Sequence, residues 1–285
     1  MEKRFAKNMR RQCSSLSSRV LSDKYTRILS VASTCVVVSC SSSASQVHTP
    51  FAPVPGALNR SAEYTVMQGL DTLALELVTT CPERIIADND SRKPAAHIHY
   101  ETEFGPNGMP TEVSLEIWDN GASISGPPSQ IARHFMVGDT AVTQVWRGNQ
   151  QQIQKSKADP RSFPLISGYV GLFSQLLRVL RAQGPGATIP VFFVGSGGGT
   201  GLASAHQELP DSLIVRLDST EFRTGWDRGD FTGGAVSSSG YRIVRTALQP
   251  PSIATARCNS PKLTPPKAVA RVESSPTRTS SLSGL

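Results

Sequence analysis

The sequence lacks several features that would settle its class at once. Only 18% of its 285 residues are charged, so it is not a highly charged disordered chain. Five cysteines in this length exclude a disulfide-dense miniprotein. The main apolar stretch, Ile28–Val38, spans 11 residues, whereas a membrane-spanning helix needs about 20. These absences leave a globular chain, and its cellular location and fold must be inferred from its charge distribution, motifs and apolar periodicity.

The formal net charge of +7 is unevenly distributed. Residues 1–39 carry eight basic and two acidic side chains, a balance of +6, and residues 247–285 carry five and one, a balance of +4. The body, 40–246, carries 16 basic and 19 acidic side chains, a balance of −3. A nucleic-acid binder concentrates positive charge on its folded domain, because phosphate contacts supply much of its affinity. We therefore expect no nucleic-acid partner.

The amino-terminal segment has the layout of an export signal. A basic, Ser-rich region over 1–27 precedes the apolar stretch, which leads into Val37-Val38-Ser39-Cys40 and a run of serines. This ending resembles a bacterial lipobox, in which a peptidase cuts before a cysteine that has received a diacylglycerol. The resemblance implies a signal peptide over 1–39, lipidation of Cys40, a Ser/Pro-rich tether over 40–61 and a membrane partner through the lipid anchor.

Other processing schemes remain open for this segment. Ordinary cleavage near Ala44 and an Arg/Ser-rich organelle transit peptide both fit the composition, and Met9 is an alternative start. The lipobox interpretation predicts an exported protein that is lipid-anchored in the cell envelope and faces the periplasm or the exterior. In an oxidising compartment Cys81 and Cys258 could pair, but a buried Cys81 with a free Cys258 fits the sequence as well.

The body shows the two-residue period of β-strands. Apolar side chains alternate with polar ones at Leu73, Leu75 and Leu77, again at Ile98, Tyr100 and Phe104, and again at Val113, Leu115 and Ile117. The turn 105–108 contains an Asn-Gly pair, and further turns fall at 138–139 and 148–149. Turns at such short intervals predict hairpin-linked antiparallel strands over 62–246.

One segment instead has a helical period, with apolar residues spaced three and four apart from Ile166 to Gln183. We therefore predict a mainly β fold: a curved antiparallel meander, a half-barrel or open barrel, covered by one main helix at about 167–183. The Pro- and Ser-rich residues 247–285 are predicted to be a disordered tail. In outline, 62–246 resembles the half-barrel of periplasmic lipoprotein carriers, which implies an apolar cavity for acyl chains.

A metal site is the sharpest enzyme-like hypothesis. His97-Ile98-His99 followed by Glu103 resembles part of the first metal-binding motif of cupins, and imidazole with carboxylate suits a transition metal. His134 is the candidate fourth ligand. The simpler interpretation is a polar outer face, because His97, His99, Glu101 and Glu103 alternate with a buried set.

Two further motifs have simpler explanations. Gly195–Gly201 lacks the lysine of a phosphate-binding loop and predicts a flexible loop between strands. Arg228-Gly229-Asp230 has the composition of a hairpin turn. The sequence contains no recognisable Ser/His/Asp set, Cys/His pair or C-x-x-C metal motif, so we expect no cofactor.

The leading functional hypothesis is a non-enzymatic envelope lipoprotein that binds an apolar ligand or an envelope protein in the crevice between sheet and helix. The alternative is a cupin-like metal-dependent enzyme that uses His97, His99 and Glu103, with His134. The candidate lining residues of the crevice are Leu73, Leu75, Ile98, Tyr100, Val113, Leu115, Phe173 and Leu177. The same residues would also form a closed core if no crevice exists.

Overall fold

The computed structural model describes residues 59–119, 124–195, 199–209, 211–227, 229–236 and 238–264. All of them belong to one compact unit, Thr49–Leu285. The predicted signal peptide, Cys40 and nearly all of the predicted tether lie outside the described residues.

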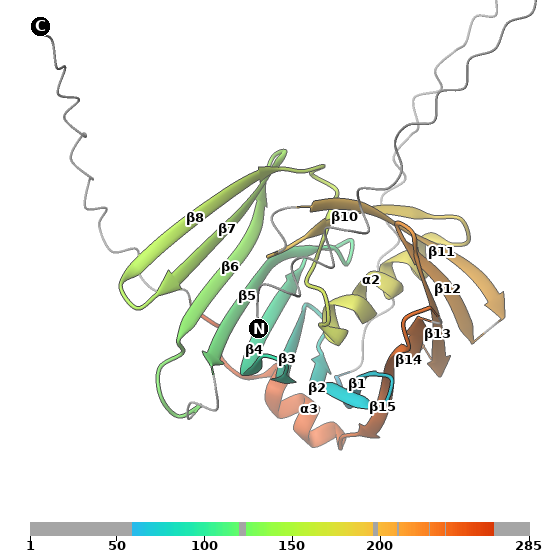
Figure 1. Cartoon of the computed structure of the whole chain (residues 1–285), viewed down its shortest axis with the longest axis horizontal. Coiled ribbons are helices and arrows are strands. Elements are labelled where there is room, and N and C mark those ends of the chain that lie inside the picture. Colours follow the sequence, from blue (N-terminus) through green and yellow to red (C-terminus); the bar gives the residue numbers. More distant parts are fainter. Residues whose placement is uncertain are drawn as a thin grey trace, which may run out of the picture. The chain divides into compact units, whose positions relative to one another are not determined.

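The described chain forms a single sheet of fifteen strands (Figure 1). The strands are β1 (Arg60–Gln68), β2 (Asp71–Thr80), β3 (Arg84–Arg92), β4 (Ala95–Phe104), β5 (Pro110–Asp119), β6 (Gln130–Val137), β7 (Thr140–Arg147), β8 (Gln150–Lys157), β9 (Phe163–Leu165), β10 (Thr188–Phe193), β11 (Gly199–Leu209), β12 (Ser212–Leu217), β13 (Thr220–Asp227), β14 (Asp230–Val236) and β15 (Tyr241–Leu248). Every neighbouring pair is antiparallel except β9 and β10, which run parallel.

The sheet consists of two meanders that join in its middle. Strands β1 to β8 run outward in chain order on one side, and β15 back to β9 run outward on the other. The join is the antiparallel pair β1–β15, which links residues about 180 positions apart, such as Ala62 and Leu248. The sheet curls around the helix α2 (Val170–Gln183), which lies inside the curve in Figure 1. The predicted mainly β fold, a curved open sheet around one main helix, is confirmed.

Local sequence accounts for most of the strand boundaries. Glycines with positive φ turn the chain between β4 and β5 (Gly108, 73°), β6 and β7 (Gly138, 60°), and β7 and β8 (Gly148, 56°). This backbone conformation costs glycine little free energy and other residues more, so glycines in the sequence indicate these turns. Some strands have no such local pattern: the Gln-rich β8 carries no apolar alternation.

Helix α2 is buried around most of its circumference rather than along one stripe. Ten of its residues are buried, including polar Ser174 and Gln175, which are each 3% exposed. Its apolar side chains complete one large core with the concave face of the sheet. A smaller cluster around Phe192 and Val194 packs β10 against Ala141 of β7, and so connects opposite parts of the curl.

The orientation of β2 differs from the sequence prediction. Its concave face carries Ala74, Glu76 and Val78, whereas Leu75 is 41% exposed. The register with β1 shifts between Val66 and Met67, so that Leu73 is the extra residue of a bulge. The three leucines therefore do not form the buried face of this strand. The small side chain of Ala74 and the carboxylate of Glu76 occupy the side that faces α2.

The predicted disordered tail from residue 247 is wrong for its first part. Strand β15 continues to Leu248, and a second helix, α3 (Pro251–Cys258), follows on the convex side of the sheet (Figure 1). Its Ala254 is buried, and the helix packs against β1, β2 and β3. A disulfide between Cys81 and Cys258 fixes this helix to the end of β2. Neither α2 nor α3 has the length and apolar character of a membrane-crossing helix.

The disulfide closes a loop of 177 residues that contains nearly the whole sheet. Replacing both cysteines, Cys81→Ser with Cys258→Ser, should lower the free energy of unfolding by about 2–5 kcal/mol, because the unfolded chain regains the entropy of that loop. Urea unfolding of both proteins measures the difference, and reductant should destabilise only the wild type. A difference below about 0.5 kcal/mol would contradict the role given to this bond.

Candidate ligand-binding site

Six of the eight predicted lining residues meet in the core. Ile98, Tyr100, Val113, Leu115, Phe173 and Leu177 are all buried and belong to the main cluster around α2. Leu73 is half-buried at the bulge and packs against the same cluster, whereas Leu75 is exposed on the opposite face. The space between sheet and helix is thus filled by these side chains, which pack as a closed core rather than as the walls of an open crevice.

At the centre of this core lies a buried carboxylate. Glu76 is 1% exposed, and its two oxygens accept four hydrogen bonds. The Tyr100 hydroxyl donates to Oε1 at 2.6 Å and the Asn89 amide donates to Oε2 at 2.7 Å. The backbone N–H groups of Val170 and Gly171 donate to Oε2 and Oε1 at 3.0 and 2.9 Å. The last two donors are the first two residues of α2, so Glu76 serves as the acceptor for the amino terminus of the helix.

Burial raises the pKa of Glu76, and the hydrogen bonds from Tyr100, Gly171, Val170 and Asn89 oppose that rise. The Asn89 amide and the two backbone N–H groups can only donate to Glu76, which favours the ionised carboxylate and offsets part of the rise in pKa. Burial also raises the pKa of Tyr100 well above its ordinary value, and the negative charge of Glu76 adds to the effect. The Tyr100 hydroxyl therefore remains a donor at every physiological pH.

Open space is found at one end of the interface between helix and sheet. A cavity of about 480 Å³, called here the rim cavity, is lined by residues 80–83 and 104–106, Gly108, Gln175 and Arg178. It is bounded by the β2–β3 turn, the β4–β5 turn and α2. The buried Gln175 amide donates to the carbonyl of Gly108 at 2.9 Å and ties one turn to the helix. None of the eight predicted lining residues borders this cavity.

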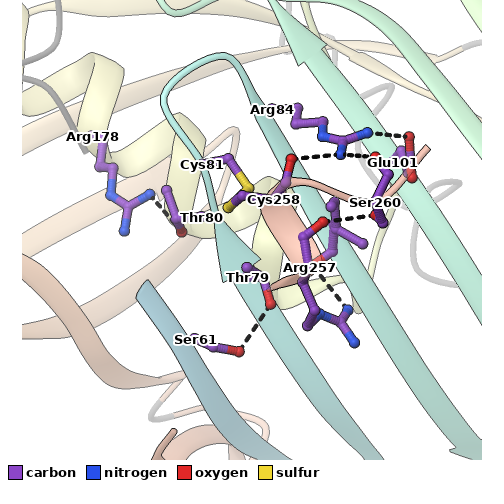
Figure 2. The surroundings of a disulfide bond; sticks show 11 residues. Ser61, Thr79, Thr80, Cys81, Arg84, Glu101, Arg178, Arg257, Cys258 and Ser260 are labelled. Atoms are coloured by element: carbon purple, nitrogen blue, oxygen red, sulfur yellow. Dashed lines mark hydrogen bonds and ion pairs between the residues drawn. A yellow bond between two sulfur atoms is a disulfide. The ribbon is translucent and has the colours of Figure 1, made fainter. Parts of the chain in front are cut away.

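Arg178 is the cationic residue of the rim cavity, which the acidic Glu83 also lines. Its side chain is 14% exposed, and its Nη1 donates to Thr80 Oγ1 at 3.1 Å (Figure 2). Its Nη2 lies 3.8 Å from Asp230 Oδ1, while Asp230 Oδ2 is bound more closely by Arg60. Burial lowers the pKa of Arg178, and the charge of Asp230 offsets only part of that effect.

The predicted metal ligands do not come together. His97, His99 and Glu103 lie on the convex face of β4, whereas His134 points from β6 into the concave side. His97 Nδ1 is 2.7 Å from Asp90, His99 Nδ1 is 2.7 Å from Asp88, and Glu103 pairs with Lys262 at 2.9 Å. Among the described residues, no group of three His, Cys, Asp or Glu side chains could hold a metal ion.

The convex face of β3 and β4 instead binds the chain that follows α3 (Figure 2). Arg84 donates from Nη2 to the carbonyl oxygens of Cys258 and Ser260, at 2.9 and 2.5 Å, and pairs with Glu101 at 3.3 Å. Glu101 also accepts the Leu263 N–H at 3.1 Å. The polar outer face predicted for β4 is therefore correct, and its function in the fold is to hold residues 258–263.

Two histidines titrate in opposite directions. Burial lowers the pKa of His99, but the hydrogen bonds and charges of Asp88 and Glu101 outweigh it and raise the pKa to about 9. His134 is 1% exposed and stacks on Phe192, with Nδ1 at 2.9 Å from Thr143 Oγ1. Burial lowers its pKa to about 4. Its Nε2 has no hydrogen-bond partner in the described structure, so a proton there would be unpaired.

Comparisons with known proteins do not assign a function. No protein-family model matches the chain, and no curated protein matches it. One similar solved structure is a DUF1089 family protein from Pseudomonas aeruginosa, with a TM-score of 0.42, 7% identity, and coverage of 61% of this chain and 94% of that one. Another is a beta-barrel-like protein of the domain of unknown function DUF1849 from Brucella abortus. Its TM-score is 0.39 and its sequence identity 8%, and the match covers 68% of this chain and 98% of that one. At these identities the likeness concerns the fold alone.

The close approach of α2 to Tyr100 can be tested with a double-mutant cycle. A Cβ on Gly171 would clash with the Tyr100 hydroxyl and lie 3.1 Å from Ile85 Cγ2. Gly171→Ala should therefore cost about 1–3 kcal/mol in free energy of unfolding, and clearly less in a Tyr100→Phe background. Tyr64→Phe removes another buried hydroxyl and serves as the control background. An equal cost in all three backgrounds would contradict the packing.

The decrease in the free energy of unfolding at acidic pH should depend on His134. Between pH 6.5 and 4 the unfolded chain binds a proton that folded His134 rejects, so stability is present above pH 6.5 and falls as pH falls. The loss is at most about 3 kcal/mol. Urea unfolding at pH 7 and pH 5 should show a smaller difference for His134→Phe than for the wild type. The exposed control His206→Asn should keep the wild-type difference, and an unchanged His134→Phe slope would refute the assignment.

Proposed function

We propose that this protein is an exported, lipid-anchored protein of the cell envelope whose folded body is a non-enzymatic binding module. The single observation that carries the export is the Cys81–Cys258 disulfide. Disulfides of this kind persist in oxidising compartments and are rare in the cytosol. The lipobox-like sequence at Cys40 supports an anchor, and the tether that follows it gives the body reach from a membrane.

The proposed binding role rests on the arrangement of polar groups. In the described structure the buried carboxylates are held by partners within the fold, Glu76 by α2 and Glu101 by Arg84 and Leu263. A catalytic group should instead face a substrate-sized space. The rim cavity offers such a space at one end of the predicted sheet–helix interface, and Arg178 supplies a cation there that suits binding.

The proposed binding position differs from the crevice predicted from the sequence. A ligand between the sheet and the middle of α2 would have to displace buried side chains such as Phe173 and Leu177. A ligand at the rim would not have to displace these side chains. The body would therefore bind a ligand or a segment of an envelope protein at its rim while the lipid holds it at the membrane.

Mass spectrometry of the mature protein tests the proposed export and lipid anchoring. We expect a chain that begins at Cys40, carries a diacylglycerol there, and partitions into detergent, because the lipid adds apolar surface that the body lacks. Cys40→Ala should abolish the modification and the partitioning. Thiol alkylation without reductant should leave Cys81 and Cys258 unmodified. An unmodified Cys40, or retention of residues before it, would refute the anchor, and reactive thiols at both positions would refute the oxidising compartment.

A further inference from the structure

The rim cavity has the construction of a preformed site. One wall is the β2–β3 turn, where Cys81 is bonded to Cys258 and its backbone N–H donates to the carbonyl of Arg84 at 2.8 Å. Another wall is the β4–β5 turn, which is closed by the hydrogen bond from Gly105 N–H to the Met109 carbonyl at 2.9 Å. Gln175 holds that turn to α2. The volume of about 480 Å³ lies within the range of small-molecule sites, and rigid walls lower the cost of ordering on binding.

The cation at this site has spare binding capacity. A guanidinium has five N–H donors, and in the described part of the chain Arg178 uses them for one hydrogen bond to Thr80 and one 3.8 Å contact with Asp230. Arg60 is the closer partner of Asp230, so these three residues together carry one excess positive charge. The charge of Arg178 is largely removed from water, and an incoming anion would restore its pairing.

The rest of the lining restricts the kind of anion. Phe104, Pro82 and Pro106 line the same cavity as Arg178, and their apolar surface suits a ligand with an apolar body. Glu83 lines the same cavity and is exposed, so it repels a second negative charge. A monoanion is therefore favoured over a dianion such as a phosphate monoester.

We propose that the rim cavity binds a small organic monocarboxylate, with the carboxylate on Arg178 and the apolar body against Phe104 and the two prolines. The proposal rests on the binding role suggested above but is independent of export. A bidentate pair with the guanidinium fixes the orientation of the head group, and the apolar wall selects against bare inorganic anions. The size of the cavity favours a short chain or a single ring.

Calorimetric and NMR titration of the full chain with octanoate tests the proposal, with octylamine and inorganic phosphate as matched probes. We expect saturable binding of octanoate in the millimolar range or tighter at low salt, with shifts at residues 80–83, 104–108 and Arg178. Octylamine and phosphate should bind at least tenfold more weakly. Saturable octanoate binding that spares these residues, or equal binding of octylamine, would overturn the proposal, and so would the absence of octanoate binding.

Variants separate the site from the fold. Arg178→Gln should weaken octanoate binding at least tenfold, and Glu83→Gln should strengthen it about twofold to threefold. Arg181→Gln is the matched control, because Arg181 lies on the same helix but stacks over Trp226, 4.5 Å from the ring centroid. It should leave the affinity within twofold. If Arg178→Gln fails to fold, Pro106→Trp fills the cavity from an exposed turn and should block binding. An unchanged affinity in the folded variant used would overturn the assignment.

One further measurement distinguishes failure of the rim site from failure of the proposed binding role as a whole. Native mass spectrometry of protein isolated from its own envelope reports any co-purified ligand, wherever it binds. A ligand that co-purifies equally with wild type and Arg178→Gln would keep the binding module and reject this site. A carboxylate that co-purifies only with wild type would support both.

Discussion

Glu76 is the acceptor on which the position of helix α2 depends. The helix begins at Val170 without a side-chain cap of its own and has no acidic residue in its first turn. Its first two N–H groups would be unpaired in an apolar core, at a cost of about 1–3 kcal/mol each, if the sheet did not supply an oxygen. Glu76 supplies two, and Tyr100 and Asn89 from the neighbouring strands complete its coordination. A sheet carboxylate, a helix terminus and two further strands thus form one buried polar unit.

This unit explains why the concave side is closed. Gly171 allows the helix to approach the Tyr100 hydroxyl, and residues such as Phe173 and Leu177 then fill the curve of the sheet. The helix also carries a polar row, Ser174, Gln175 and Arg178, that follows Gly171 toward the rim. Gln175 and Arg178 end beside the turns that the disulfide and the α3 segment stabilise. The same helix that closes the core therefore brings a charged side chain to the rim cavity.

The local pattern of the sequence was sufficient for much of this fold. Alternation on β4 and β5, the glycine turns and the helical period of α2 all predicted the correct elements, because each depends on neighbouring residues. The face of β2 was predicted wrongly, since three leucines outweighed Ala74 and Glu76 in a pattern that does not include the bulge at Leu73. The β1–β15 pairing, the disulfide and the docking of α3 depend on partners more than 170 positions away. No local signal identifies such partners, and Arg178 acquires its role only from them.

We infer that α2 is a fixed part of the core, so that the proposed ligand would bind at the rim and not beneath the helix. Native-state hydrogen exchange of the Val170 and Gly171 amides, followed by NMR over a range of urea concentrations, tests this most directly. We expect both amides to exchange only through global unfolding, with an opening free energy equal to the free energy of unfolding of the whole domain. Exchange through a local opening several kcal/mol below the global value, insensitive to urea, would contradict it. Such a result would mean that α2 leaves the sheet and that a crevice opens beneath it.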